Sequence, residues 1–166
     1  ILCRSGRSLV DTQRVIAHTG LPLYRFLYIS SAGVYADSVS FPLDEESPLD
    51  THSRHYGKAE TEAWLIKEAI PFTSFRPTYI YGPANYNPIE KWFFDRLMND
   101  RPIPLPNDGS LITQLGHVDD LALAMKMSLH SDKSLNKIYN CSDNKGITLL
   151  GLVSIAALSC GKEASK

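Results

Sequence analysis

Apolar runs of strand length alternate with helical patterns along the chain, and this alternation constrains the fold more than any other feature. Strand-like runs are expected at 26–29, 72–81, 111–115 and 137–141, and helical patterns at 11–18, 54–70, 88–99, 121–129 and 148–159. Alternation of this kind implies parallel strands joined by crossover helices. The sequence therefore predicts an α/β fold, with residues 1–166 as a single domain.

Several helix ends are indicated by capping residues. Asp11 is the expected N-cap of the first helix, which runs through His18 and ends at Gly20. The other helices are expected to start at Asn87 with Pro88 in the first helical position, at Asp119 or Asp120, and at Thr148.

The helix expected over 54–70 has a periodic apolar face. Ala59, Ala63, Ile66 and Ile70 recur at spacings of three and four, and the proline that follows them stops the helix. The polar stretch 36–53 is expected to be a surface loop, 101–106 an extended edge segment, and 107–110 a turn.

The run 72–97 is expected to carry the functional site. Residues 72–81 favour one buried strand, which Gly82 and Pro83 stop, and a loop at 84–87 precedes the next helix. Ligands of open α/β sheets bind just beyond the C-terminal ends of strands. The loop after Tyr81 is therefore the expected place for function.

Composition excludes some classes of function. The formal net charge of −1 gives no global attraction to nucleic acid or anionic membranes, and no apolar run approaches the roughly 18 residues of a membrane span.

The three cysteines fit no zinc or disulfide spacing, which favours a reducing compartment. The acidic residues 44–46 are expected to form a solvated face, because three adjacent carboxylates do not easily converge on one ion. No metal site is predicted.

Two motifs carry a resemblance to a known family. RPTYIYGP, at 76–83, resembles the RPxxxYGP segment of the extended short-chain dehydrogenase/reductase superfamily, which includes nucleotide-sugar epimerases and dehydratases. NYNPIEKWFFDRL, at 85–97, resembles the chloroplast stem-loop-binding proteins and their cyanobacterial relatives, an atypical branch of that superfamily. The resemblance implies a partial doubly wound, Rossmann-like sheet with a small substrate-side region. No GxGxxG turn is present, so the chain is expected to be the middle and C-terminal part of a longer protein, with the pyrophosphate site outside it.

The superfamily's chemistry is hydride transfer with NAD or NADP, assisted by a serine or threonine and a Tyr-x-x-x-Lys pair on one helix face. The resemblance places Ser31, in YISSAGVY, at the catalytic hydroxyl position. Two alignments of the next helix remain. One takes Tyr56 as the acid/base, with Glu60 at the lysine position; the other, favoured by KAETEAWL, takes Lys58 as the lysine, with Arg54 four residues before it. Neither contains an intact pair, and the SRHxGK pattern of the stem-loop-binding branch shares this departure.

The resemblance also implies binding residues along the central run. Thr78 and Tyr79 join Lys58 as expected cofactor-binding residues, and the expected substrate-side residues are Tyr81, Asn85, Tyr86 and Asn87. Nucleotide-sugar enzymes carry an arginine about four residues before the HVDDLA histidine, where this chain has Thr113. Without that arginine, a charge-assisted contact to the diphosphate is lost, so the sequence argues less strongly for a nucleotide-sugar substrate.

Two functions follow as hypotheses. The first is an atypical nucleotide-binding protein that acts on structured RNA or in a ribonucleoprotein, in a cyanobacterial cytoplasm or the chloroplast stroma. The second is an active nucleotide-sugar epimerase, dehydratase or reductase. No membrane association is expected in either case, and the sequence leaves the oligomeric state open, with a homo-oligomer as one alternative. Aromatic residues at 79, 81, 86 and 92–94 offer stacking surfaces for bases, although two of Trp92, Phe93 and Phe94 are expected to be core.

Overall fold

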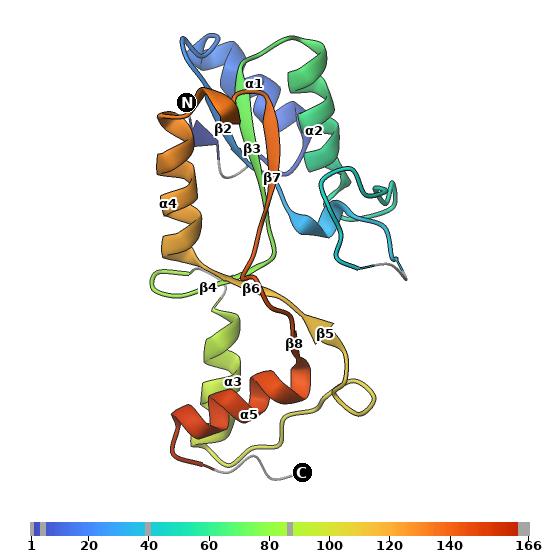
Figure 1. The fold of residues 1–166 in the computed structure, drawn as a ribbon, viewed down its shortest axis with the longest axis vertical. Coiled ribbons are helices and arrows are strands. Elements are labelled where there is room, and N and C mark those ends of the chain that lie inside the picture. The colour runs from blue at the N-terminus through green and yellow to red at the C-terminus, as the bar shows by residue number, and fades with distance from the viewer. Residues whose placement is uncertain (1, 4–5, 39–40, 86–87, 163–166) are drawn as a thin grey trace. The chain divides into compact units, whose positions relative to one another are not determined.

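The computed structural model describes residues 2–3, 6–38, 41–85 and 88–162, and the chain divides into two compact units. Unit 1 comprises 1–78 and 120–141, and unit 2 comprises 79–119 and 142–166. The elements of unit 1 are β1 (Leu2–Cys3), α1 (Leu9–Thr19), β2 (Phe26–Ile29), the 3₁₀ turn η1 (Ala32–Val34), α2 (Tyr56–Lys67), β3 (Phe72–Pro77), η2 (Asp132–Ser134) and β7 (Lys137–Cys141) (Figure 1). Helix α4 (Val118–Leu129) crosses the boundary between the units at its first turn.

Unit 1 is built on a parallel sheet with the strand order β1-β2-β3-β7. Each neighbouring pair is parallel, which confirms the α/β prediction and its crossover helices. The core lies where α1 and α2 meet the strands, and it includes Ile16, Phe26, Tyr28, Leu65 and Phe72. Burial of these large side chains stabilises the sheet by roughly 1.5–3 kcal/mol each. The sheet thus gives β2 and β3 a fixed C-terminal edge.

The prediction of one continuous strand over 72–81 is wrong. It divides at Thr78 into β3, which pairs with β7, and β4 (Tyr79–Tyr81), which pairs with β6 (Leu115–His117) in unit 2. The β3–β7 ladder ends where Pro77 pairs with Cys141, and Thr78 adds one last backbone hydrogen bond to the Cys141 carbonyl at 3.1 Å. Beyond that point β7 has ended, so the chain takes a new strand partner.

The N-cap of α1 is Ser8 rather than Asp11. Ser8 Oγ accepts a hydrogen bond from the Asp11 backbone N–H at 3.4 Å, and the Asp11 carboxylate accepts one from the Ser8 N–H at 3.0 Å. Asp11 therefore occupies the third helical position of a capping box, where its charge also suits the helix dipole. The predicted C-terminal end at Gly20 is confirmed.

The predicted apolar face of α2 is only half correct. Ala59 and Ile70 are buried, whereas Ala63 is exposed and Ile66 is 58% exposed. The buried face instead contains Glu62, at 2% exposure, and the helix ends at Lys67 rather than at Ile70. A charged residue is buried here because β3 supplies its partner, which helical periodicity cannot reveal.

Unit 2 contains β4, α3 (Ile89–Met98), β5 (Ile112–Thr113), β6, β8 (Ile147–Thr148) and α5 (Leu149–Ser159). Thr148 caps α5 as predicted, with its Oγ1 accepting from the Gly151 N–H at 3.0 Å. The strand predicted over 111–115 is divided between β5 and β6, and 101–106 forms no strand. Asp119 and Asp120 lie inside the first turn of α4, so neither is its N-cap.

Helix α3 begins at Ile89 with Pro88 at the N-cap, and the predicted N-cap Asn87 lies outside the described residues. The expectation that two of its three aromatics are core is wrong. Trp92 is 43% exposed, Phe94 is 37% exposed, and Phe93 is only partly buried. Within unit 2, α3 packs mainly on α5 and β4, and the guanidinium of Arg96 lies over the Trp92 ring at 4.9 Å from its centre.

Candidate functional site

The C-terminal end of β2 carries two adjacent serines. Ser30 is 2% exposed, and its Oγ has no hydrogen-bond partner among the described residues. Ser31 begins η1, and its Oγ accepts a hydrogen bond from the Gly33 N–H at 3.1 Å. A buried hydroxyl that lacks a partner is costly, so a ligand group that pairs with Ser30 would be stabilised here.

Lys58 brings its ammonium group to the same strand end. Its Nζ donates to the carbonyl oxygen of Ile29 at 2.6 Å and lies 5.5 Å from the centre of the Tyr28 ring. Lys58 is therefore tied to β2 two residues before Ser31, whereas Glu60 is exposed on α2. The helix register that places a lysine beside the serine is the one that uses Lys58.

Tyr56 and Arg54 lie at the start of the same helix. Tyr56 is the first residue of α2 and is partly buried, with its backbone N–H donating to the Ser53 carbonyl at 2.9 Å. Arg54 is exposed, four residues before Lys58, and its Nε donates to Nε2 of His55 at 3.1 Å. A guanidinium stays protonated in proteins, so Arg54 cannot exchange a proton with a substrate. The catalytic role of Tyr56 stays a prediction.

The turn before α2 is fastened to η1. Ser53 Oγ donates to the Gly33 carbonyl at 2.6 Å and accepts from the His55 N–H at 3.1 Å. The His55 ring lies so close to Gly33 that a Cβ at that position would be 2.6 Å from its Cδ2. Gly33 therefore allows the turn of Ser53 to His55 to approach the strand end that carries Ser31.

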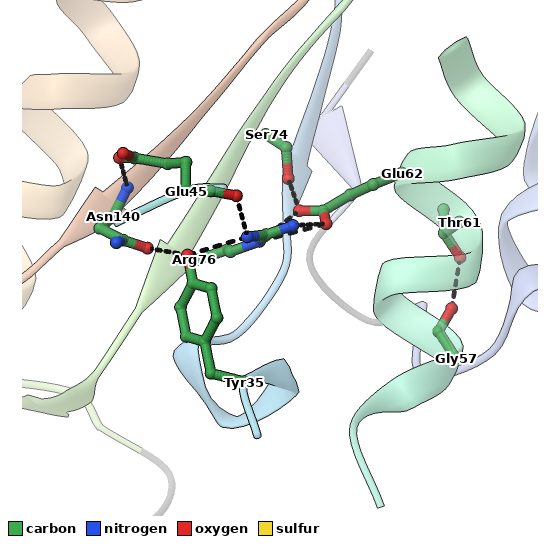
Figure 2. A network of polar contacts seen from close by, with 8 residues as sticks. All are labelled: Tyr35, Glu45, Gly57, Thr61, Glu62, Ser74, Arg76 and Asn140. Atoms are coloured by element: carbon green, nitrogen blue, oxygen red, sulfur yellow. Dashed lines mark hydrogen bonds and ion pairs between the residues drawn. The ribbon is translucent and has the colours of Figure 1, made fainter. Parts of the chain in front are cut away.

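A buried ion pair that sequence reasoning missed fixes α2 on β3 (Figure 2). Arg76 Nη2 donates to Glu62 Oε2 at 2.7 Å, and Arg76 Nε lies 3.2 and 3.3 Å from the two carboxylate oxygens. Ser74 Oγ donates to Glu62 Oε1 at 2.6 Å. Side-chain exposure is 4% for Arg76 and 2% for Glu62. The sequence contained one signal for the burial of this carboxylate. Glu62 lies four residues after Lys58 and therefore shares a helix face with it.

The same guanidinium holds the loop that follows η1 (Figure 2). Arg76 Nη1 donates to Tyr35 Oη at 2.8 Å and to the Glu45 carbonyl at 3.1 Å. Tyr35 Oη donates to Asn140 Oδ1 at 2.7 Å, and the Glu45 carboxylate accepts from the Asn140 N–H at 2.6 Å. Glu45 is thus partly buried and engaged, which corrects the expectation of a wholly solvated acidic cluster.

Unit 2 has a separate, mostly apolar cavity of about 710 Å³. Tyr81, at the end of β4, lines it beside His117, and their rings meet edge to face at 5.1 Å. Glu90 Oε1 accepts from the Gly82 N–H at 3.1 Å, while Glu90 Oε2 is buried and without a hydrogen-bond partner among the described residues. The remaining lining comes mainly from α3, α5 and the residues 143–147. Its size is that of a small-molecule site.

The other predicted binding residues are dispersed. Tyr79 is 57% exposed, and Asn85 Nδ2 donates to the Ile80 carbonyl at 2.7 Å, which supports the turn after β4. Thr78 belongs to unit 1, where its backbone extends the β3–β7 ladder. Tyr86 and Asn87 lie outside the described residues. Tyr81 is therefore the predicted substrate-side residue that the structure places in a cavity.

The described part of the chain shows neither a metal centre nor a membrane span. Among the described residues, no group of three or more histidine, cysteine or acidic side chains is arranged to hold a metal ion. No helix in the same ranges combines the length and the apolar character that crossing a membrane requires.

Comparison with known proteins agrees with these features. A curated relative, "Chloroplast stem-loop binding protein of 41 kDa b, chloroplastic" of Arabidopsis thaliana, is 46% identical over 158 residues, 95% of this chain and 41% of that protein. This confirms the resemblance inferred from residues 76–97. A dTDP-glucose 4,6-dehydratase of Streptomyces niveus is 26% identical over 84% of this chain and 43% of its own length. The chain thus spans less than half the length of these two relatives.

Solved structures show the same fold. UDP-glucuronic acid 4-epimerase from Bacillus cereus, in complex with UDP-glucuronic acid and NAD, superposes with a TM-score of 0.81 at 20% identity, covering 98% of this chain and 54% of its own. UDP-glucose 4-epimerase from Thermus thermophilus, in complex with NAD, gives a TM-score of 0.76 at 21% identity, covering 95% and 54%. The profile of the NAD dependent epimerase/dehydratase family matches residues 8–142. The chain therefore belongs to the NAD dependent epimerase/dehydratase family.

Proposed function

We propose that the intact protein binds a nicotinamide nucleotide at the C-terminal end of β2 and acts on structured RNA. The observation that carries the RNA part is the 46% identity, over 95% of this chain, to a stem-loop binding protein. Membership of the family supports binding of a nucleotide cofactor. The hydrogen-bonding groups at the end of β2 could hold such a cofactor. Lys58 would hold a ribose hydroxyl, and the unpartnered Ser30 hydroxyl would gain a hydrogen bond. NAD or NADP, when bound, would supply a hydride acceptor.

The absence of an intact acid/base pair supports this function over ordinary sugar chemistry. Arg54 occupies the position four residues before Lys58 and keeps its proton. Arg54 at that position can orient and bind an anionic or hydroxyl-bearing ligand but cannot transfer a proton. We further propose, from the chloroplastic relative, that the protein works in the chloroplast stroma or a cyanobacterial cytoplasm.

The test titrates the intact protein with NAD, NADP and a fluorescent stem-loop RNA over a series of salt concentrations. RNA binding through phosphate contacts weakens steeply with salt, so a linear fall of log affinity with log salt is expected. Lys58→Ala is expected to lose cofactor affinity, and Lys67→Ala, an exposed lysine at the end of the same helix, is the matched control. A protein that bound cofactor tightly but no RNA at physiological salt would contradict the RNA function.

A nucleotide-sugar epimerase, dehydratase or reductase is a second candidate. It is favoured by the placement of Lys58 beside the strand end that carries Ser31, together with the family match. This candidate requires a proton-transferring residue, and Tyr56 is the titratable phenol at the start of α2. It predicts that Ser31→Ala and Tyr56→Phe each abolish turnover of a nucleotide sugar while cofactor binding persists. Absence of turnover in the wild type would eliminate this candidate, whereas equal turnover in the wild type and both variants would refute the roles given to Ser31 and Tyr56.

A further inference from the structure

Four basic side chains surround the start of α2: Arg7, Arg54, His55 and Lys58, which we call the α2 basic cluster. Arg54 and His55 come from the turn before the helix, and Lys58 from its first turn. The segment of Arg7 lies directly beneath the helix, because a Cβ on Gly57 would be 2.7 Å from the Arg7 carbonyl oxygen. Two chain segments thus contribute positive charge to one place.

In the geometry at His55, one ring nitrogen serves as a hydrogen-bond acceptor. Arg54 Nε donates to His55 Nε2 at 3.1 Å, and because the guanidinium is always protonated, Nε2 must act as the acceptor. The ring is kept in place by its contact with Gly33 and by the hydrogen bond from the His55 N–H to Ser53 Oγ. His55 therefore presents an acceptor to a cation in a setting already rich in positive charge.

No carboxylate offsets this charge at His55 in the described structure. Burial of the ring lowers the pKa of His55, and the positive charges of Arg54, Lys58 and Arg7 lower it further. The carboxylate of Asp11, the acidic residue of α1, accepts hydrogen bonds from the Ser8 hydroxyl and from the Ser8 and Arg7 backbone N–H groups, and it is not among the charges that shift the pKa of His55. An anion bound at His55 would therefore supply a counter-charge that the described residues do not provide there.

We propose that the α2 basic cluster is a binding site for a phosphate group of the ligand, with Arg54 as the direct contact and His55 as a second positive charge, because protonation of its Nε2 releases Arg54 Nε to the phosphate. A guanidinium matches the oxygens of a phosphate in a forked pair of hydrogen bonds, and the N-terminal end of α2 adds a favourable dipole. The site lies against Gly33, two residues after Ser31, so it would fix a phosphorylated ligand beside the strand end. The inference rests on the proposed function in naming what is recognised there, but inorganic phosphate tests it without RNA or nicotinamide.

The experiment measures the pKa of His55 by NMR in the intact protein, with inorganic phosphate compared with chloride at equal ionic strength. Bound phosphate favours the protonated imidazole, so the pKa of His55 should rise, and a rise of about one unit corresponds to about tenfold tighter binding to the protonated form. His18, an exposed residue in the last turn of α1, serves as the internal reference and should not shift.

Two charge-matched variants decide the outcome. Arg54→Gln should abolish the phosphate-induced shift, while Arg14→Gln, which removes an exposed arginine from α1, should retain it. Both positions are exposed, so neither variant is expected to unfold the protein. No shift in the wild type, or an equal shift in both variants, would overturn the site.

Competition then distinguishes the source of the phosphate. A stem-loop RNA that raises the pKa of His55 in place of inorganic phosphate indicates a backbone phosphodiester, whereas the same effect from a nucleotide indicates the phosphate of a small ligand. A phosphate effect without any RNA binding would refute the proposed RNA function and leave the anion site standing. RNA binding that is unchanged in Arg54→Gln, with no phosphate effect, would refute the site alone.

Discussion

Removal of the Glu62 carboxylate is the most informative perturbation of this fold. In Glu62→Ala, the Nε and Nη2 donors of Arg76 and the Ser74 hydroxyl all lose their acceptor inside a site where Arg76 is only 4% exposed. The Nη1 donor keeps Tyr35 Oη and the Glu45 carbonyl, so the guanidinium retains neutral partners only. The variant therefore leaves a buried positive charge without its counter-charge.

The expected loss is large compared with the stability of a domain. Breaking a buried ion pair by removing one partner costs about 3–5 kcal/mol. Because the free energy of unfolding of a domain is about 5–15 kcal/mol, Glu62→Ala should unfold a substantial fraction of the protein or shift its midpoint strongly. Replacing both partners in Glu62→Met/Arg76→Met removes the uncompensated charge, and Tyr35 Oη still has Asn140 Oδ1 at 2.7 Å. The double variant should therefore be more stable than Glu62→Ala.

Chemical denaturation followed by circular dichroism measures these differences. Glu60→Ala is the matched control, because Glu60 is an exposed glutamate of the same helix and its loss should change stability by no more than about 0.5 kcal/mol. The cycle of Glu62→Met, Arg76→Met and the double variant should show a coupling energy of about 0.5–3 kcal/mol. A Glu62→Ala variant as stable as the control, or strictly additive single effects, would refute the reasoning.

Gly57→Ala should destabilise the protein by about 1–3 kcal/mol in denaturant unfolding, because its Cβ would lie 2.7 Å from the Arg7 carbonyl oxygen and 3.1 Å from Ser8 Cα; a gain of about 1 kcal/mol from helix propensity alone would contradict this. Burial is the main cause that raises the pKa of Cys141 to about 11, so in a variant with no other cysteine its rate of modification by a disulfide reagent should still be rising at about pH 9. A plateau near pH 8 would be inconsistent with that burial. Because burial and neighbouring cations lower the pKa of His55, the unfolded state binds more protons below about pH 6.5, and stability should fall as the pH drops through that value. His55→Gln should remove this part of the pH dependence, and an unchanged pH profile would show that His55 does not titrate as proposed.

Local patterns in the sequence were enough to locate most strands and helices of unit 1, although not β1 or the ends of α2 and β3, and to locate one end of the site. The strand at 26–29 was predicted from its apolar run, the resemblance of YISSAGVY placed Ser31 just after it, and the parallel orientation of the strands followed from the alternation of strands and helices. These features depend on side-chain periodicity and on residues close together in the chain. The motif at 76–97 likewise indicated the family, because its residues are contiguous in the chain.

The partners of buried charges were decided only by tertiary structure. Periodicity assigned Ala63 and Ile66 to the buried face of α2, but the structure buries Glu62 because Arg76 reaches it from β3. The strand predicted to end at Tyr81 divides at Thr78 because β7 ends there and β6 takes over the pairing. The cluster of Arg54 with His55 also depends on Gly33, which lies on a separate segment of the chain.

The sequence by itself determined the α/β class, the parallel orientation of the strands in the main sheet and the family, since each is encoded in local patterns of apolar residues and short motifs. Tertiary structure alone decided which charged side chains are buried together, where the central strand changes partner, and which basic residues meet beside Ser31. The physical reason is that the cost of burying or gathering charge depends on partners brought in by the fold, which no local pattern specifies.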